Sequence, residues 1–206
     1  MTFQVTPAFG RGQTHYKGQT IDTADYGGSV ALEGLEGIFD DRGLRTSTEP
    51  QTVRSGLKTK GIICRNVSGI ALLPSRAVSF SAGFQNRRTA GYTTTDWAAV
   101  AGVVDDQLPA AGVPNGDLFW LLVEGPALML TDLAGGALNV INEGDHIVAL
   151  TAATSQATTA GRVQSYVATS NATNIATMVL NRVGTAMSAK TTANSNATVL
   201  VNLRLR

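Results

Sequence analysis

Short apolar segments of strand length, separated by turn residues, recur from Gly61 onward and limit the folds that this chain can adopt. The last of them, Thr198–Leu205, has apolar side chains at every second position from Val199. A period of two places these side chains on one face of a half-buried strand. Long helical patterns do not interrupt the series, so residues 61–206 are predicted to form an all-β domain, a β-barrel or sandwich.

Nine segments carry this prediction. They are Gly61–Asn66, Ile70–Leu73, Ala77–Phe80, Val100–Val104, Leu118–Val123, Ala127–Thr131, His146–Leu150, Arg162–Ala168 and Thr198–Leu205. The pattern of residues 172–183 fits either one face of a helix or a strand, so the sequence does not decide their secondary structure.

The first 60 residues differ from the rest of the chain. They contain scattered glycines and the polar stretch Thr46–Gly56, which has little apolar material for a core. Within them, Ser29–Asp40 can form a short helix, because Val30, Leu35 and Ile38 fall near one face. The sequence therefore predicts two parts, an extended N-terminal arm (1–60) with at most a short helix, and the β-domain (61–206).

Composition and motifs argue against several classes of site. One cysteine, Cys64, excludes intrachain disulfides and four-thiolate metal centres, and two histidines leave little for a histidine-rich metal site. Searches for phosphate-binding glycine loops, zinc-protease helices and hydrolase nucleophile elbows find nothing. We therefore expect a protein that is not an enzyme, with no catalytic, cofactor-binding or metal-ligating residues.

The N-terminus has no basic segment followed by an apolar one, so no secretory signal is expected. The longest large-apolar run, Leu118–Val123, is far shorter than the roughly 20 residues that span a bilayer. We expect a soluble protein with no membrane partner.

Charge is strongly segregated along the chain, although the net charge is only +1. Residues 1–41 carry two basic and six acidic residues, residues 42–88 nine basic and one acidic, residues 89–161 eight acidic and no Lys or Arg, and residues 162–206 five basic and no acidic. Such blocks predict surfaces that meet a partner. The alternative is that the fold brings opposite blocks together and neutralises them within one molecule.

The basic block raises the question of nucleic-acid binding. Only Phe80 and Phe84 interleave it with aromatic rings, and the chain as a whole is almost neutral. Non-specific phosphate binding favours a more basic protein, so a nucleic-acid partner is not expected.

Two glycine-aspartate pairs, Gly116-Asp117 and Gly144-Asp145, stand directly before predicted strands. Glycine adopts the positive φ of a tight turn, and aspartate accepts backbone N–H bonds there, so these residues are predicted structural turns. A general acid–base pair is the alternative, and it requires the two carboxylates to share a cleft.

The apolar run Leu118–Val123 contains one of the two tryptophans. Its simplest interpretation is core. The alternative is a subunit interface, for which Phe119, Trp120 and Leu122 are the candidate residues.

Several short motifs, in order, resemble the β-barrel head decoration (cement) proteins of tailed bacteriophages. The resemblance covers about residues 61–206. It rests on the runs Cys64–Phe80, Val103–Asp106, Gly112–Trp120, Ile141–Val148, Thr151–Gly161, Asn181–Ala189 and Val199–Arg206.

This resemblance implies a non-enzymatic protein on the exterior of the virion, assembled in the host cytoplasm, that clamps neighbouring major capsid subunits. It also implies a homo-oligomer, usually a trimer and sometimes a dimer, in which joined weak contacts raise avidity. An arm would suit residues 1–60. The candidate capsid contacts lie in and beside this arm: Arg42, Arg45, Arg54, Lys58 and Lys60.

Two other functions compete with this expectation. One is a different structural role in a virion, in a tail tube or in head completion. The other is a carbohydrate-binding or hydrolytic β-barrel, which needs acidic residues beside exposed aromatic rings. Trp120 lies in an apolar run, which argues against a sugar-stacking platform.

Overall fold

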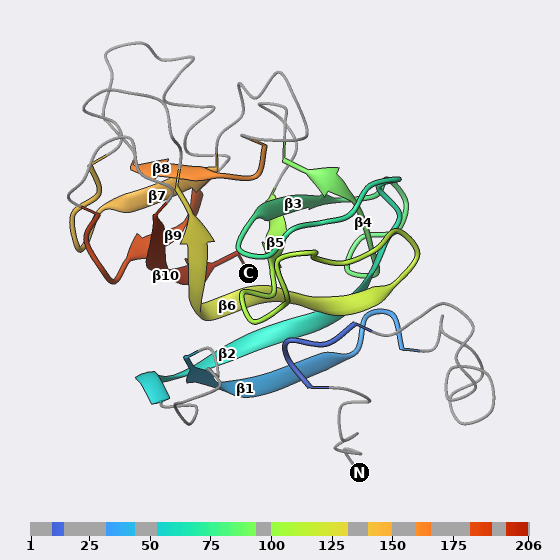
Figure 1. Ribbon diagram of the computed structural model, residues 1–206, viewed down its shortest axis with the longest axis horizontal. Helices are drawn as coiled ribbons and strands as arrows, with labels where there is room; N and C mark the ends of the chain where they lie inside the picture. Colours follow the sequence, from blue (N-terminus) through green and yellow to red (C-terminus); the bar gives the residue numbers. More distant parts are fainter. Residues whose placement is uncertain are drawn as a thin grey trace.

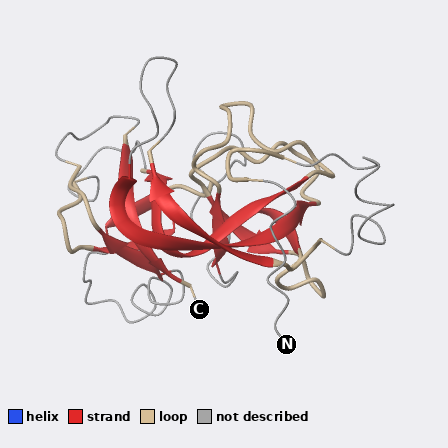
Figure 2. Ribbon diagram, turned by 90° about the horizontal axis from the view of Figure 1, so that it is seen from below, coloured by secondary structure: helices blue, strands red, loops and turns tan. Residues whose placement is uncertain are grey.

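A computed structural model describes eight stretches of the chain: residues 10–14, 32–43, 53–93, 100–131, 140–149, 160–165, 182–190 and 197–205. The described part is all-β, as the sequence predicts, and it contains strands, turns and no helix (Figure 2). The strands are β1 (Glu36–Arg42), β2 (Val53–Asn66), β3 (Ala77–Phe80), β4 (Arg88–Tyr92), β5 (Val100–Val104), β6 (Leu118–Leu130), β7 (His146–Ala149), β8 (Val163–Ser165), β9 (Arg182–Ala186) and β10 (Thr198–Arg204).

These strands form one hydrogen-bonded sheet in the order β1-β2-β4-β3-β5-β6-β10-β9-β7-β8 (Figure 1). Because β2 also pairs with β6, the strands β2, β4, β3, β5 and β6 close into a ring. Every pairing in this ring is antiparallel except that of β2 with β4. The hairpin strand β1 extends the sheet outside the ring.

A second ring shares β6 with the first. The far half of β6 pairs with β10, and the sheet continues through β9 and β7 to β8. A parallel bridge between Thr131 and Val163 links β8 back to the end of β6. Seen from below, the strands gather in two groups joined across the centre (Figure 2).

β6 passes from one ring to the other at Gly125, which has φ +84°. A Cβ atom there would lie 2.1 Å from the carbonyl oxygen of Lys58, far inside van der Waals contact. Only glycine allows the backbone of β6 to turn this close to β2.

Each ring has its own apolar core. The first is filled from β2, β5 and β6 by side chains such as Ile62, Val104 and Phe119. The second is filled mainly from β6, β9 and β10, with Met129 and Val201 fully buried, and it also takes Val103 from β5 of the first ring. A third cluster lies between the β1–β2 hairpin and the outer face of β6.

Trp120 is the largest side chain of this third cluster. Its indole packs edge-on against Phe39, with ring centroids 4.8 Å apart and planes at 72°. A Cβ atom at Gly37 would lie 2.9 Å from the indole, so a residue without a side chain is needed there. The position opposite in the β1–β2 register is Gly61, which also lies against the indole.

Most of the predicted strands are found. Ala77–Phe80 and Val100–Val104 have the predicted bounds, while Leu118–Val123 and Ala127–Thr131 fall largely in one continuous strand, β6. In β10 the alternate residues Val199, Val201 and Leu203 are buried, as predicted. The segment Ile70–Leu73 forms only an isolated bridge at Leu72.

The predicted helix over Ser29–Asp40 is wrong, because Glu36–Arg42 is a strand that pairs with β2. Pairing with β2 and packing on Trp120 override the helical spacing of Leu35 and Ile38. The proposed division at residue 60 falls inside β2, which runs without a break from Val53 to Asn66. For residues 172–183, only the last two lie in the described part, and they belong to β9.

Candidate binding surface

The β1–β2 hairpin exposes large apolar side chains to solvent. Ile38 is 70% exposed, Val53 60% and Leu57 45%, whereas most of the large apolar side chains in the described part are buried. These three residues come from two strands at one end of the sheet. Ile38 and Leu57 line one groove, whereas Val53 lies opposite Arg42, further along the hairpin. Exposed apolar groups among charged neighbours are typical of a site that meets another protein.

Charged side chains surround the exposed apolar residues, and each pairs within the chain. Lys58 bonds to Asp40, Arg42 lies 3.1 Å from the other oxygen of Asp40, and Lys60 lies 2.8 Å from Glu36. Hydrogen bonds from Lys58 and Arg42 lower the pKa of Asp40. Exposed pairs of this kind contribute little to stability, so these charges remain able to exchange partners on binding.

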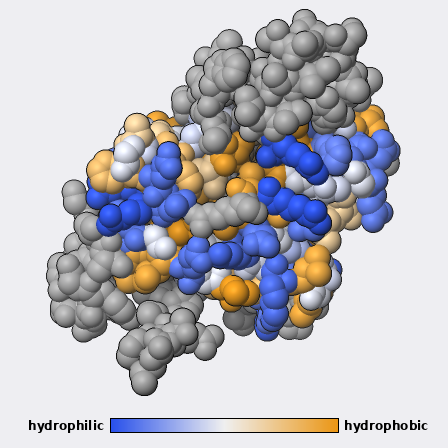
Figure 3. Space-filling view, turned by 180° about the vertical axis from the view of Figure 1, so that it is seen from behind, coloured by the Kyte–Doolittle hydropathy of each residue, from blue (hydrophilic) through white to orange (hydrophobic). Residues whose placement is uncertain are grey.

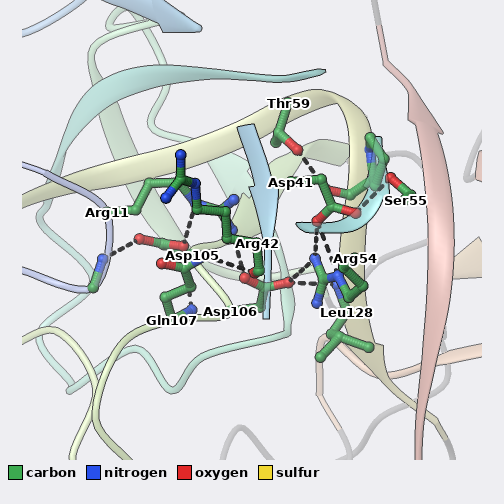
Figure 4. Close-up of polar contacts among 12 residues, drawn as sticks. Arg11, Asp41, Arg42, Arg54, Ser55, Thr59, Asp105, Asp106, Gln107 and Leu128 are labelled. Atoms are coloured by element: carbon green, nitrogen blue, oxygen red, sulfur yellow. Dashed lines mark hydrogen bonds and ion pairs between the residues drawn. The ribbon is translucent and has the colours of Figure 1, made fainter. Parts of the chain in front are cut away.

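Two predicted contact residues do not belong to this exposed set. Arg45 lies outside the described residues. Arg54 is largely buried, with a side chain that is 17% exposed, and its Nε donates to Asp41 at 2.9 Å. Its Nη2 reaches Asp106 at 3.1 Å (Figure 4). Burial opposes the charge of Arg54, but its bonds to the two aspartates outweigh that effect and raise its pKa.

Arg11 holds a short N-terminal segment against the loop after β5 (Figure 4). Its Nε donates to Asp105 at 3.0 Å, its Nη2 donates to Asp106, and the backbone N–H of Gly12 donates to Asp105 at 2.6 Å. The side chains of Arg11 and Asp105 are 4% and 0% exposed. Burial raises the pKa of Asp105, and the positive charge of Arg11 opposes that rise.

No pattern in the sequence predicts this buried network. It joins Arg11 with residues 94 and 95 positions away, and no local pattern reports such a contact. The adjacent acids Asp105 and Asp106, directly after an apolar strand, were the one available signal.

A further buried carboxylate, Glu33, lies beside the hairpin. Glu33 accepts from the Nε atoms of Arg65 at 2.6 Å and Arg88 at 3.0 Å, and its side chain is fully buried. With the pairs above, most of the described basic residues of 42–88 meet acids of 1–41 or of the loop after β5. Arg76 instead donates to the carbonyl oxygen of Ala160. This favours the alternative in which the fold neutralises opposite charge blocks within one molecule.

The three candidate oligomer residues are core. Phe119 and Leu122 are fully buried and Trp120 is 1% exposed within a single chain. Their side chains belong to the three apolar clusters, so an oligomer interface must use other residues. Burial of Trp120 also removes it as a platform for sugar stacking, and Trp97 lies outside the described residues.

The predicted turn residues occupy turns of different rings. Gly116 and Gly144 have φ +97° and +91°. Asp145 accepts from the N–H of Asn142 and from the hydroxyl of Ser165, both at 2.9 Å, and so fixes the entry to β7. The backbone carbonyl of Asp117, before β6, accepts from Asn66 N–H at 2.9 Å.

Two grooves border the β1–β2 hairpin. One, of about 500 Å³, lies where the hairpin meets the bend of β6 and the end of β10, and Leu57, Lys60 and Arg204 line it. The other, of about 370 Å³, runs beside β1 between Ile38 and the side chains of Arg11 and Gln107. The face of the molecule in Figure 3 interleaves hydrophilic and apolar groups.

Among the described residues, no group of three or more His, Cys, Asp and Glu is placed to hold a metal ion. Cys64 is buried in the first core. In the same part of the chain, no helix has the length and apolar character needed to span a bilayer.

Comparisons with known proteins do not assign the chain to a group. No protein-family model matches it, and a search of curated proteins also finds no match.

Proposed function

We propose that this chain is a non-enzymatic structural protein of a tailed-bacteriophage virion. It binds the outer surface of the capsid and stabilises contacts between major capsid subunits. The observation that carries the proposal is the β1–β2 hairpin, which exposes Val53 and Leu57 of β2 among charged side chains.

The chemistry of the hairpin suits adhesion to another protein. Burial of the exposed Val53 and Leu57 would supply free energy at about 25 cal/mol per Å² of apolar surface. The surrounding Lys58 and Lys60 would orient the encounter and change its rate more than its final strength. Their positions overlap the predicted contact set, from which the buried Arg54 drops out.

The ordered motifs over residues 61–206 support the capsid role, through their resemblance to head decoration proteins. The buried acids support a structural role. Asp105 and Asp106 are engaged by arginines and backbone N–H groups, and Asp145 closes a turn. These carboxylates hold strands and loops in place.

A co-sedimentation assay tests the proposal. Mature heads and isolated tails of the phage that encodes the chain, both freed of it, are incubated with the purified full chain and pelleted. The chain should saturate the heads and leave the tails unbound, and cryo-EM of the decorated heads should show it on the outer surface. Binding to tails alone, or to neither particle, would refute the capsid role.

Variants locate the contact. Val53→Asp combined with Leu57→Asp should weaken head binding at least tenfold, because charge replaces apolar contact area. Val140→Asp is the matched control, since Val140 is also exposed but lies before β7, and it should bind like the native chain. If the hairpin variant binds as tightly as the control, the contact surface lies elsewhere.

A further inference from the structure

The outer edge of β1 lies at one end of the sheet (Figure 1). β1 pairs with β2 along one side, and no described strand pairs with its other side. An open edge presents backbone N–H and C=O groups that can bind another strand. Ile38, in the middle of β1, is the most exposed large apolar side chain of the described part.

The pairing register of β1 with β2 shows which backbone groups of β1 point away from β2. Ile63 N–H donates to the carbonyl of Leu35 at 2.8 Å, in the same register that pairs Gly37 with Gly61. Hydrogen bonding alternates along an antiparallel pair, so Gly37 and Phe39 bond to β2. The N–H and C=O groups of Ile38 and the next even position therefore face outward.

At the Arg42 end of this edge, one backbone group is already bonded within the chain, so the free hydrogen-bonding groups lie at the centre of β1. Gln107 Nε2 donates to the carbonyl oxygen of Arg42 at 3.0 Å. The groove of about 370 Å³ runs beside Ile38, Phe39 and Asp40. Among the described residues, no strand occupies this side of β1 at Ile38 and Asp40, and Arg11 and Gln107 form the other wall of the groove.

We propose that β1 pairs antiparallel with β1 of a second copy of this chain, about a two-fold axis through Phe39. Even-numbered side chains of β1 share its outer face, so they must lie opposite one another across the new pair. In the register centred on Phe39, Glu36 of each copy lies opposite Arg42 of the other. Ile38 lies opposite Asp40, and their backbone groups exchange the central hydrogen bonds.

The charges of β1 favour this register over the neighbouring ones, and they favour a second copy of the chain as the partner. A shift of two residues one way places Glu36 opposite Asp40 of the other copy, and a shift the other way places two copies of Asp40 opposite each other. Like charges directly opposite destabilise a strand pair. Only the register centred on Phe39 pairs opposite charges at both ends, and the same sequence supplies both strands, as a closed two-fold interface requires.

The inference does not depend on the capsid role. The dimer uses the edge of β1, whereas the proposed capsid contact uses Val53 and Leu57 of β2. Failure of head binding leaves the dimer untouched, and loss of the dimer leaves binding by single chains measurable.

Sedimentation equilibrium of the full chain over a micromolar concentration range tests the dimer. The native chain should show a reversible dimer of 21.5 kDa subunits. Glu36→Arg and Arg42→Glu should each weaken dimerisation by about tenfold or more, because each places like charges opposite one another. The double variant Glu36→Arg/Arg42→Glu should restore the native dissociation constant within about threefold. Glu124→Arg makes the same charge change as Glu36→Arg, off β1, and should leave dimerisation unchanged.

Ile38→Pro gives a second test that does not depend on charge. Proline is tolerated on an edge strand where its N–H would face outward, so the monomer should fold, with native tryptophan fluorescence. The variant should be monomeric. The proposal is wrong if the native chain is only a monomer or a trimer, if Ile38→Pro remains dimeric, or if the double charge variant fails to recover.

Discussion

Substitution of Arg11 by alanine should lower the free energy of unfolding strongly, although its partners Asp105 and Asp106 lie 94 and 95 positions further along the chain. Arg11 bonds to both Asp105 and Asp106, and all three side chains are at most 4% exposed. Removing one partner of a buried ion pair leaves an uncompensated charge and costs about 3–5 kcal/mol. Asp105 keeps bonds from Gly12 N–H and Gln107 N–H, and Asp106 keeps Arg54, so we expect the lower end, about 3 kcal/mol.

The pH dependence separates loss of charge pairing from loss of packing. The pKa of Asp105 is already raised by burial, and loss of Arg11 removes the charge that opposes the rise. A carboxyl with a raised folded-state pKa contributes stability at low pH that is lost as pH rises through that pKa. The destabilisation by Arg11→Ala should therefore be smaller at pH 5 than at pH 7.

Urea unfolding followed by tryptophan fluorescence at both pH values measures these effects. Arg182→Ala is the control, since Arg182 is exposed, and it should change the free energy of unfolding by less than about 0.5 kcal/mol. A loss below about 1 kcal/mol for Arg11→Ala, equal at the two pH values, would show that the buried network does not hold the N-terminal segment.

Three further substitutions test the fold. An alanine in a left-handed backbone conformation lowers the free energy of unfolding by about 1–2 kcal/mol. Gly56→Ala, at φ +71° with no atom within 4 Å of the new Cβ, should show only that loss in urea unfolding. Gly125→Ala should show a much larger loss or fail to fold, because its Cβ would meet the carbonyl oxygen of Lys58. Trp120→Ala should cost about 3–5 kcal/mol in calorimetry and leave the mass in sedimentation unchanged, since the side chain is core; a changed oligomer would contradict that placement. Burial raises the pKa of Tyr92, so its contribution to stability is present below its ordinary value of 10.0 and is lost as pH rises through the folded-state pKa. Tyr92→Phe should flatten the alkaline limb of the stability curve, and an unchanged limb would contradict it.

The sequence predicted strands best where burial is continuous. Val100–Val104 is entirely buried, so its apolar run reports the strand directly. The strand β1 was predicted as a helix because Val30, Leu35 and Ile38 have helical spacing. Its actual conformation depends on pairing with β2 and on the close approach of Trp120 to Gly37. β4 was not predicted, and the start of β9 was left open between helix and strand, because their short sequences mix glycine, arginine and threonine with few large apolar residues.

The binding surface could be predicted only in part. The charge of their segment predicts Lys58 and Lys60 as contacts; on the hairpin Lys58 is exposed and Lys60 is half-buried. The same charge argument included Arg54, which the fold buries against Asp41 and Asp106. Charge along a sequence does not show which cations find acids within their own chain, because that depends on contacts between distant segments.

The sharing of β6 by two rings sets the order in which the protein can be completed during synthesis. Glu124–Leu130 must wait for its neighbour β10, which occupies Thr198–Arg204 near the C-terminal end of the chain. The first ring uses only strands between Val53 and Leu130, so it can close while the ribosome is still adding the remaining residues. Until β10 emerges, half of β6 and the apolar side chains that Val199, Val201 and Leu203 later cover stay open. A chain released before β10 is made would therefore have a complete first ring and an unpaired edge on β6 with exposed apolar side chains. Chaperones and proteases recognise such surfaces.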